Sequence, residues 1–176
     1  MPQAQNMSHE KRPTLRKPVA EDGGAIWDLV RACKPLDENS MYCNLIQCDH
    51  FRDTCVVVEL DGKILGWVSA YVMPSEPDTL FVWQVAVSPD ARGMGLGTKM
   101  LGHILDRDVC EDVTRLQTTI TRGNEASWSL FRRFCERRFG RFDSQPHFIR
   151  DDHFMGLHPT EYMVTIKLPG RMKKAA

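Results

Sequence analysis

The chain has 176 residues, of which 42% are hydrophobic and 26% are charged, and its formal net charge at pH 7 is zero. These values are typical of a single globular domain that buries a sizeable core. The charge balance argues against nucleic acid or an anionic membrane surface as a partner, because both select a basic face.

The sequence predicts neither a secretory signal nor a membrane span. Residues 1–14 lack the apolar core of a secretory signal, and no uncharged apolar run approaches the ~20 residues that cross a bilayer. We therefore expect a cytoplasmic protein with a disordered tail over 1–14, one domain over 15–168 and a flexible tail over 169–176. Its six cysteines should stay reduced, and Cys43, Cys48 and Cys55 lack the spacing of a zinc site.

The predicted domain opens with a strand and a helix. Leu15 to Val19 is expected to form the strand. From Asp22 to Cys33 the apolar residues recur with the spacing i, i+3, i+4, i+7, which predicts an amphipathic helix that stops before Pro35. Asp37 and Glu38 follow in a predicted loop.

A hairpin comes next. Thr54 to Leu60 and Ile64 to Val72 are rich in β-branched residues, and Asp61-Gly62 between them predicts a tight turn. Pro74 and Pro77 are expected to break the second of these strands.

The middle of the chain combines a strand, a glycine-rich turn and a helix. Leu80 to Val87 is apolar on both sides, which indicates a central strand of the sheet. The run Arg92-Gly93-Met94-Gly95-Leu96-Gly97 follows it, and a helix is predicted from about Thr98 to Arg107.

The last predicted elements are a strand, a helix and a strand. Arg115 to Thr121 and Glu161 to Leu168 are the strands, and Asn124 is a good N-cap for the helix between them. The inner face of that helix is expected to carry Trp128, Phe131, Phe134 and Cys135. This order of elements predicts the α+β class, with a mixed α/β sheet.

The glycine-rich run predicts a pyrophosphate site. Glycine adopts positive φ and lets a ligand approach the backbone, and a helix N-terminus supplies N–H donors and partial positive charge. Arg92 adds a cation at the mouth. The glycines are spaced two and two, unlike the dinucleotide fingerprint, and Gly97-Thr98-Lys99 does not have the order of a P-loop.

The same run resembles the Arg/Gln-x-x-Gly-x-Gly/Ala motif with which the Gcn5-related N-acetyltransferases bind the pyrophosphate of coenzyme A. The order of predicted elements is also similar to that family. The resemblance implies a central, mostly antiparallel sheet with helices on both faces, and acetyl-CoA as co-substrate with no metal. It further implies that the coenzyme contacts Val85, Ala86, Val87, Arg92, Gly93, Gly95, Gly97, Thr98 and Asn124.

Within this set the resemblance gives each segment a task. Val85 and Val87 would bind the pantetheine arm as a pseudo-strand, and an N–H near Ala86 or Val87 would face the thioester carbonyl. The simplest interpretation of the nearby basic cluster is a solvated helix face, although one or two of its members could contact coenzyme phosphates. The cluster consists of Arg132, Arg133, Arg137, Arg138 and Arg141.

Three further segments narrow the resemblance. Pro35 to Asn44, Phe81 to Val87 and Asn124 to Trp128 are similar to the L-2,4-diaminobutyrate acetyltransferases of ectoine biosynthesis. The resemblance implies that acetyl passes from acetyl-CoA to the 4-amino group of the diamino acid, giving N4-acetyl-L-2,4-diaminobutyrate. It also implies a homodimer and a role in osmoadaptation.

A pocket for this substrate needs anions for two ammonium groups and a donor for one carboxylate. Asp37 lies in a loop where this fold usually admits the acceptor, and Tyr42 close by in the sequence offers a hydroxyl. Trp83 on the central strand could form an apolar or cation–π wall for an ammonium group. We expect Asp37, Tyr42 and Trp83 to bind the substrate.

The reaction also needs a proton acceptor. An alkylamine titrates near ~10.4, so about one in 10³ molecules is nucleophilic at neutral pH and a base must help. Glu161 is the preferred base, because Trp83 and Gln84 occupy the usual acidic position on the central strand, and His158 could share or replace its role.

One family feature is absent. Many members place a tyrosine seven residues after the asparagine as general acid for the thiolate, and this chain has Phe131 there. Ser127, Ser129 or a water could replace it, or the thiolate could leave unassisted.

Other functions stay open on the sequence alone. The acceptor could be a polyamine or a peptide N-terminus, and Phe131 keeps open a non-catalytic module that binds acetyl-CoA. Asp151-Asp152-His153 is better explained as a surface turn than as a metal site.

Overall fold

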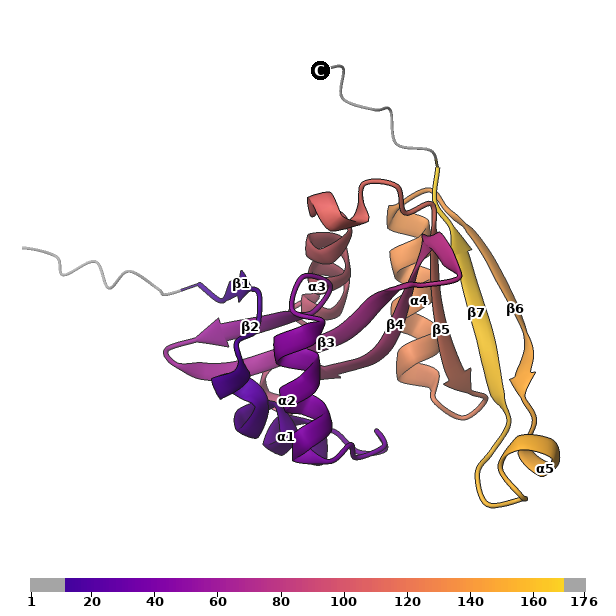
Figure 1. Cartoon of the computed structure of the whole chain (residues 1–176), viewed down its shortest axis with the longest axis horizontal. Coiled ribbons are helices and arrows are strands. Elements are labelled where there is room, and N and C mark those ends of the chain that lie inside the picture. Colours follow the sequence, from indigo (N-terminus) through magenta and orange to yellow (C-terminus); the bar gives the residue numbers. More distant parts are fainter. Residues whose placement is uncertain (1–11, 170–176) are drawn as a thin grey trace, which may run out of the picture.

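A computed structural model describes residues 12–169, which form a seven-stranded sheet in the order β1-β2-β3-β4-β5-β7-β6 (Figure 1). Every neighbouring pair is antiparallel except β4 and β5, which are parallel. Most of the two predicted tails, residues 1–11 and 170–176, lies outside the described residues. The strands are β1 (Thr14–Arg16), β2 (Val56–Leu60), β3 (Lys63–Met73), β4 (Glu76–Val87), β5 (Arg115–Thr121), β6 (Arg141–Phe148) and β7 (Glu161–Lys167).

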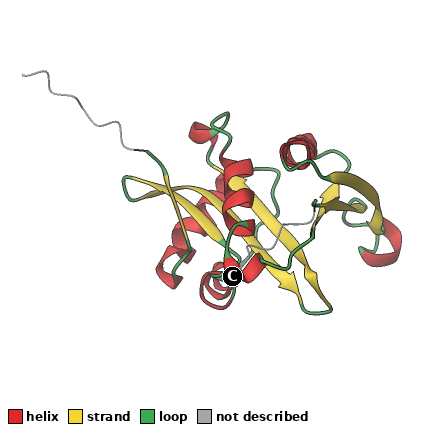
Figure 2. Ribbon diagram, turned by 90° about the horizontal axis from the view of Figure 1, so that it is seen from above, coloured by secondary structure: helices red, strands yellow, loops and turns green. Residues whose placement is uncertain are grey.

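Helices cover both faces of this sheet (Figure 2). Successive residues of β2 alternate between two apolar clusters. Val56 and Val58 pack with α3 (Leu96–Leu105) and α4 (Glu125–Arg137), whereas Val57 packs with α1 (Gly23–Ala32). None of the helices within residues 12–169 has the length and apolar character that a membrane span requires. The α-helices are α1 (Gly23–Ala32), α2 (Met41–His50), α3 (Leu96–Leu105), α4 (Glu125–Arg137) and α5 (Arg150–His153), and short 3₁₀ helices span Ala20–Asp22, Pro89–Ala91 and Asp108–Cys110.

The predicted α+β fold, with its mostly antiparallel sheet between helices, is confirmed. The predicted strand over Arg115 to Thr121 matches β5 in both bounds. The Asp61-Gly62 hairpin joins β2 to β3, and both residues have positive φ, +50° and +76°, as a type I′ turn requires.

Several features differ from the prediction, and the predicted strand from Leu15 to Val19 is shortened to Thr14–Arg16. Pro77 lies inside β4, near its start, where the strand pairs with β3 at Glu76 alone before the register shifts. The helix α2 was not predicted, because its buried side includes the polar residues Asn44 and Gln47. The edge strand β6 is polar, mostly exposed and contains Pro146, so it lacks an alternating pattern, and the short helix α5 follows it.

The central strand β4 is paired on both sides for only part of its length. It pairs with β5 over three residues, Thr79 to Phe81, and beyond that point the two strands separate. On the other side, Gln84 faces Ser69 and Val82 faces Ala70, so Trp83 is the extra residue of a β-bulge. The open edge of β4 leaves backbone polar groups available to a ligand.

Candidate active site

The glycine-rich turn joins β4 to α3. Gly95 is the N-cap of α3 with φ +70°, and Gly93 has φ +82°. Both conformations strain any residue with a Cβ. The first N–H groups of α3 have no acceptor within the helix, so they can serve a ligand.

Gly97 has a different reason to be glycine. It lies in the first turn of α3 at ordinary helical φ, and a Cβ there would come within 2.8 Å of Leu130 Cδ1 on α4. Its small size allows α3 and α4 to approach each other beside the turn. The predicted motif therefore combines two positions that need positive φ with one that needs space.

A cavity of about 620 Å³ opens in front of this turn. Its lining includes Arg92, Gly93, Gly95, Gly97 and Thr98 from the turn, Val85 and Val87 from β4, and Asn124 from the start of α4. The predicted coenzyme residues thus lie together, except that the side chain of Ala86 is buried on the α1 side of the sheet.

Three arginines give this first cavity a positive lining. Arg92 stands at the turn, and Arg133 and Arg137 project from α4. Arg137 Nη1 donates to Thr98 Oγ1 at 3.2 Å, which ties α4 to the start of α3. Guanidinium groups beside open N–H donors suit a polyphosphate. Part of the basic cluster on α4 therefore faces the cavity, as the sequence left open.

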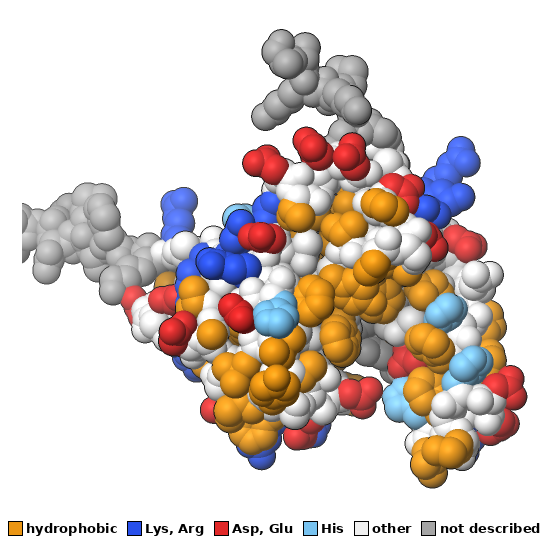
Figure 3. Space-filling view, viewed as in Figure 1, with side chains coloured by type: hydrophobic (Ala, Val, Ile, Leu, Met, Phe, Trp, Pro, Cys, Tyr) orange, Lys and Arg blue, Asp and Glu red, His pale blue; other side chains and the backbone are white. Residues whose placement is uncertain are grey.

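A second cavity of about 570 Å³ continues from the first. Five residues line both cavities, so that the two meet at the open edge of β4; they are Pro35, Leu36, Val85, Asn124 and Ser127. The second cavity contains Asp37, Trp83, His158 and Glu161 among its lining residues. Figure 3 shows the hydrophobic side chains around α2 and the middle of the molecule, and the separate β6–α5–β7 arm beside them.

Two carboxylates flank a histidine in the second cavity. His158 Nε2 lies 3.5 Å from Asp37 Oδ2 and 3.8 Å from Glu161 Oε1. His158 Nδ1 lies 2.8 Å from the carbonyl oxygen of Pro159, which can only accept, so this nitrogen carries a proton. The sequence positions 37, 158 and 161 come together although they belong to segments at opposite ends of the domain.

Glu161 is the most buried of these three residues. Its side chain is 15% exposed, compared with 84% for Asp37. Burial raises the pKa of Glu161 and the charge of Asp37 raises it further, whereas His158 and a hydrogen bond with Thr119 act in the opposite direction. A carboxylate with a raised pKa is a better proton acceptor than an exposed one.

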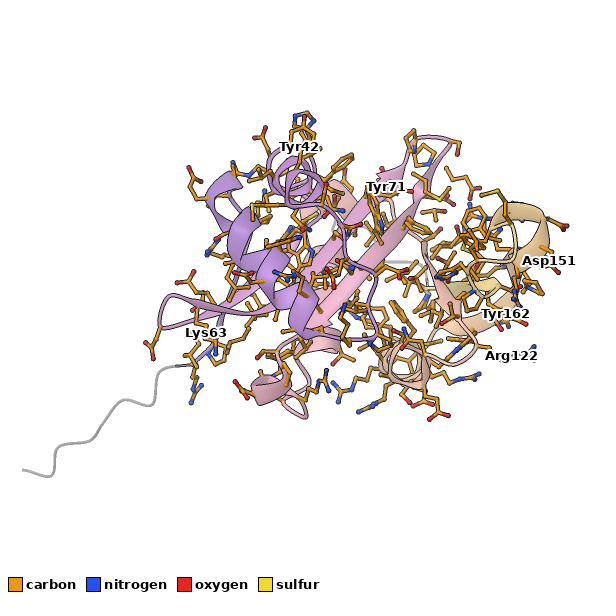
Figure 4. The ribbon with its side chains drawn as sticks, turned by 90° about the horizontal axis from the view of Figure 1, so that it is seen from below. Tyr42, Lys63, Tyr71, Arg122, Asp151 and Tyr162 are labelled. Atoms are coloured by element: carbon orange, nitrogen blue, oxygen red, sulfur yellow. The ribbon has the colours of Figure 1, made fainter. Side chains whose placement is uncertain are left out.

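Of the predicted substrate residues, Trp83 lines the second cavity and Tyr42 does not. Trp83 projects from the bulge of β4 into the second cavity and is 49% exposed. Tyr42 is 71% exposed on α2 and lines neither cavity, and Figure 4 shows it at the outer side of that helix. The geometry gives its assignment no support.

No hydroxyl replaces the missing tyrosine at its own position. Phe131 is 2% exposed and forms part of the wall of the second cavity. Ser127 lies one turn earlier on α4 and lines both cavities, whereas Ser129 lines the first alone. Asn124 Oδ1 accepts from the N–H of Ser127 at 3.1 Å, so Asn124 caps α4 as predicted and lines the site as well.

Sequence reasoning missed two polar residues of the second cavity. Gln84 is uncharged, and its buried amide donates a hydrogen bond to the loop that carries Asp37. Thr119 belongs to β5 and bonds Glu161 from the next strand. The alternation of polar residues along β5 was the available signal.

Within residues 12–169 no cluster of three or more His, Cys, Asp or Glu is placed to hold a metal ion.

The chain is similar to known acetyltransferases. Residues 24–136 match the model of the Acetyltransferase (GNAT) family. The L-2,4-diaminobutyric acid acetyltransferase of Methylotuvimicrobium alcaliphilum is 46% identical over 153 residues, 87% of this chain and 89% of that protein. The protein of the same name from Vibrio cholerae is 47% identical over 155 residues, 88% and 89% of the two chains.

The chain is also similar to solved acetyltransferase structures. The diaminobutyrate acetyltransferase of Paenibacillus lautus, in complex with its substrate L-2,4-diaminobutyric acid and coenzyme A, has a TM-score of 0.86 and 33% identity, covering 94% of this chain and 99% of that one. Ard1 from Thermoplasma volcanium, at 13% identity, has a TM-score of 0.69 over 89% of this chain and 99% of its own, which is a likeness of fold.

Proposed function

The chain belongs to the acetyltransferase (GNAT) family, and on this premise we propose that it transfers the acetyl group of acetyl-CoA to the 4-amino group of L-2,4-diaminobutyrate. One observation carries the proposal. A cavity lined by arginines and a glycine turn meets, at the open edge of β4, a second cavity that holds Asp37, His158 and Glu161. The first suits a pyrophosphate and the second suits an acceptor with more than one ammonium group. The similarity to diaminobutyrate acetyltransferases supports the same assignment.

The first cavity would bind coenzyme A. The N–H groups around Gly93 and Gly95, with Arg92, would hold the pyrophosphate, and Arg133 and Arg137 would face its remaining phosphates. The pantetheine arm would extend along β4 beyond Phe81, where the strand has lost its partner β5. Backbone groups of β4 would bind it as they would bind a neighbouring strand.

The thioester would lie where the cavities meet. A backbone N–H of β4 near Ala86 or Val87 would stabilise the developing oxyanion, because a fixed amide needs no reorganisation during the reaction. Ser127 lines both cavities and could donate a hydrogen bond to the departing thiolate. A serine hydroxyl is a much weaker acid than a thiol of pKa ~8.5, so its role would be hydrogen bonding rather than proton transfer.

The second cavity would bind the diamino acid. Asp37 and Trp83 would contact its ammonium groups, and Glu161, with His158, would accept the proton that the reacting amine loses. The product would be N4-acetyl-L-2,4-diaminobutyrate, which places the reaction in ectoine biosynthesis and gives the protein a role in osmoadaptation.

We also propose that the protein is a homodimer. Three large apolar side chains on or beside the β6–α5–β7 arm, Phe139, Met155 and Leu157, are each more than 80% exposed. Such side chains are common at interfaces between subunits. Light scattering coupled to size exclusion should give twice the 20.2 kDa of one chain, and a stable monomer at micromolar concentration would contradict the proposal.

An acceptor screen tests the proposed function. Release of the coenzyme thiol should be measured with diaminobutyrate, ornithine, lysine and spermidine side by side. We expect the highest kcat/KM with diaminobutyrate. Preference for spermidine or for a peptide N-terminus would assign a different acceptor. Tight acetyl-CoA binding without turnover of any amine would instead indicate a binding module.

A further inference from the structure

The loop between α1 and α2 forms a wall of both cavities. Pro35 and Leu36 line the two cavities, and Asp37 extends toward His158. Glu38 of this loop forms ion pairs at the surface: it pairs with Lys34, and with Arg31 at 3.6 Å, while its side chain is 40% exposed. Exposed pairs of this kind contribute little to holding a loop in place.

The firmer link comes from β4. Gln84 Nε2 donates to the carbonyl oxygen of Asp37 at 2.8 Å, and Gln84 Oε1 accepts from Asn39 Nδ2 at 3.4 Å. The Asp37 carbonyl can only accept, so the Nε2 end of the amide must face it. One side chain therefore binds the loop on both sides of residue 38.

This side chain is well placed to act as a fixed point. Gln84 is 8% exposed, and it follows Trp83, the extra residue of the β-bulge. Trp27 of α1 adds a hydrogen bond from Nε1 to the carbonyl oxygen of Asn39 at 3.1 Å. The carboxylate of Asp37 is itself 84% exposed, so its place near His158 depends on where the backbone is held.

We propose that Gln84 is a positioning residue that holds the loop from Pro35 to Asn39 against β4 and thereby sets the acceptor-binding geometry of Asp37. This inference rests on the proposed function for its kinetic consequences. Both polar ends of the Gln84 amide bond the loop, so its proposed role is to bind the protein rather than the substrate. An amide is required, because a carboxylate at the same place cannot donate to the Asp37 carbonyl.

Two variants separate the amide from its volume. Gln84→Leu keeps similar bulk and removes both hydrogen bonds, and Gln84→Glu keeps the shape and replaces the donor by an acceptor. We expect the KM for diaminobutyrate to rise by about tenfold in each, since a buried hydrogen bond is worth on the order of tenfold. The KM for acetyl-CoA and the kcat should change by less than about twofold.

Gln117→Leu is the matched control. Gln117 is a half-buried glutamine on β5 whose Nε2 donates to Thr165 Oγ1 at 3.1 Å, and it lines neither cavity. Both KM values should stay at their wild-type levels in this variant. Should Gln84→Leu fail to fold, Asn39→Ala, which removes the weaker of the two bonds, carries the test with an expected rise of about threefold.

Hydrogen exchange provides a readout that does not depend on the acceptor. In Gln84→Leu the amides from Leu36 to Asn39 should exchange faster than in the wild type, whereas those of β5 should not change. A wild-type protein inactive on diaminobutyrate would refute the proposed function and leave the exchange result standing. An active wild type, with unchanged exchange and an unchanged KM for diaminobutyrate in both Gln84 variants, would overturn the positioning role.

Discussion

Replacing Glu161 by glutamine removes the proposed proton acceptor while preserving its shape. Its side chain is 15% exposed, and His158 Nε2 lies 3.8 Å from Oε1, so Glu161→Gln should fit without new space or contacts. A general base contributes about 10²- to 10⁴-fold to the rate, which corresponds to roughly 3–5 kcal/mol of transition-state free energy. We therefore expect kcat/KM for diaminobutyrate to fall by about 10²- to 10⁴-fold, with little change in the KM for acetyl-CoA.

Although Glu161→Gln should lower the activity, it should not lower the stability of the protein. Because the folded state raises the pKa of Glu161, the folded protein binds this proton more tightly than the unfolded chain does. The carboxyl group therefore costs stability progressively as the pH rises from its unfolded-state pKa through its folded-state pKa. A neutral glutamine removes that cost, so the Tm of Glu161→Gln at neutral pH should equal or exceed that of the wild type.

The assay measures release of the coenzyme thiol against pH, and Glu136→Gln on the exposed side of α4 is the control. In the wild type, kcat/KM should rise with pH as Glu161 ionises, at a pH above the ordinary range of a glutamate. In Glu161→Gln this rise of kcat/KM with pH (the acid limb of the profile) should be absent. Activity within about threefold of the wild type, with the same limb present, would refute the role of Glu161 as proton acceptor.

Three further predictions follow from the same site. Asp37 raises the pKa of Glu161, so Asp37→Asn should move the rise of kcat/KM with pH to lower pH. His158 lowers the pKa of Glu161, so His158→Ala should move that rise to higher pH. Shifts of the opposite sign would contradict these roles. Gly95→Ala, at φ +70°, should lower the free energy of unfolding by about 1–2 kcal/mol and weaken acetyl-CoA binding. Gly24→Ala in α1 has no atom within 4 Å of the new Cβ and should raise the free energy of unfolding by about 0.5–1 kcal/mol. Chemical denaturation measures both changes. Ser127→Ala should lower kcat by about tenfold and Ser129→Ala by less than about twofold, and equal effects would exclude a special role for the residue where the cavities meet.

The elements that the sequence predicted well are those with a regular apolar pattern. The helix α1 buries Ile26, Leu29 and Val30 at the predicted spacing, and the hairpin turn needed two residues that tolerate positive φ. The helix α2 could not be recognised in this way, since Asn44 and Gln47 occupy its buried side. The two amides bond each other at 3.2 Å within the helix, and buried polar residues interrupt the apolar pattern by which a helix is predicted.

The same difference holds for the site. The turn from Arg92 to Gly97 is one continuous segment, so its conformation and its charge are both encoded locally. The acceptor cavity is assembled from β4, β5, the start of β7 and the loop after α1, and no spacing in the sequence reveals that Asp37 approaches His158. Gln84 is the clearest example, because its role depends on a loop that lies 47 residues earlier in the chain.

Transfer of the acetyl group to the 4-amino group of diaminobutyrate can be tested directly by determining the structure of the product. The purified chain should be incubated with acetyl-CoA labelled with ¹³C in the acetyl group and with L-2,4-diaminobutyrate, and the product examined by two-dimensional NMR. We predict a correlation from the labelled carbonyl to the protons on carbon 4, with the amine on carbon 2 left free. Acetylation at the 2-amino group, or no labelled product, would contradict the proposed reaction.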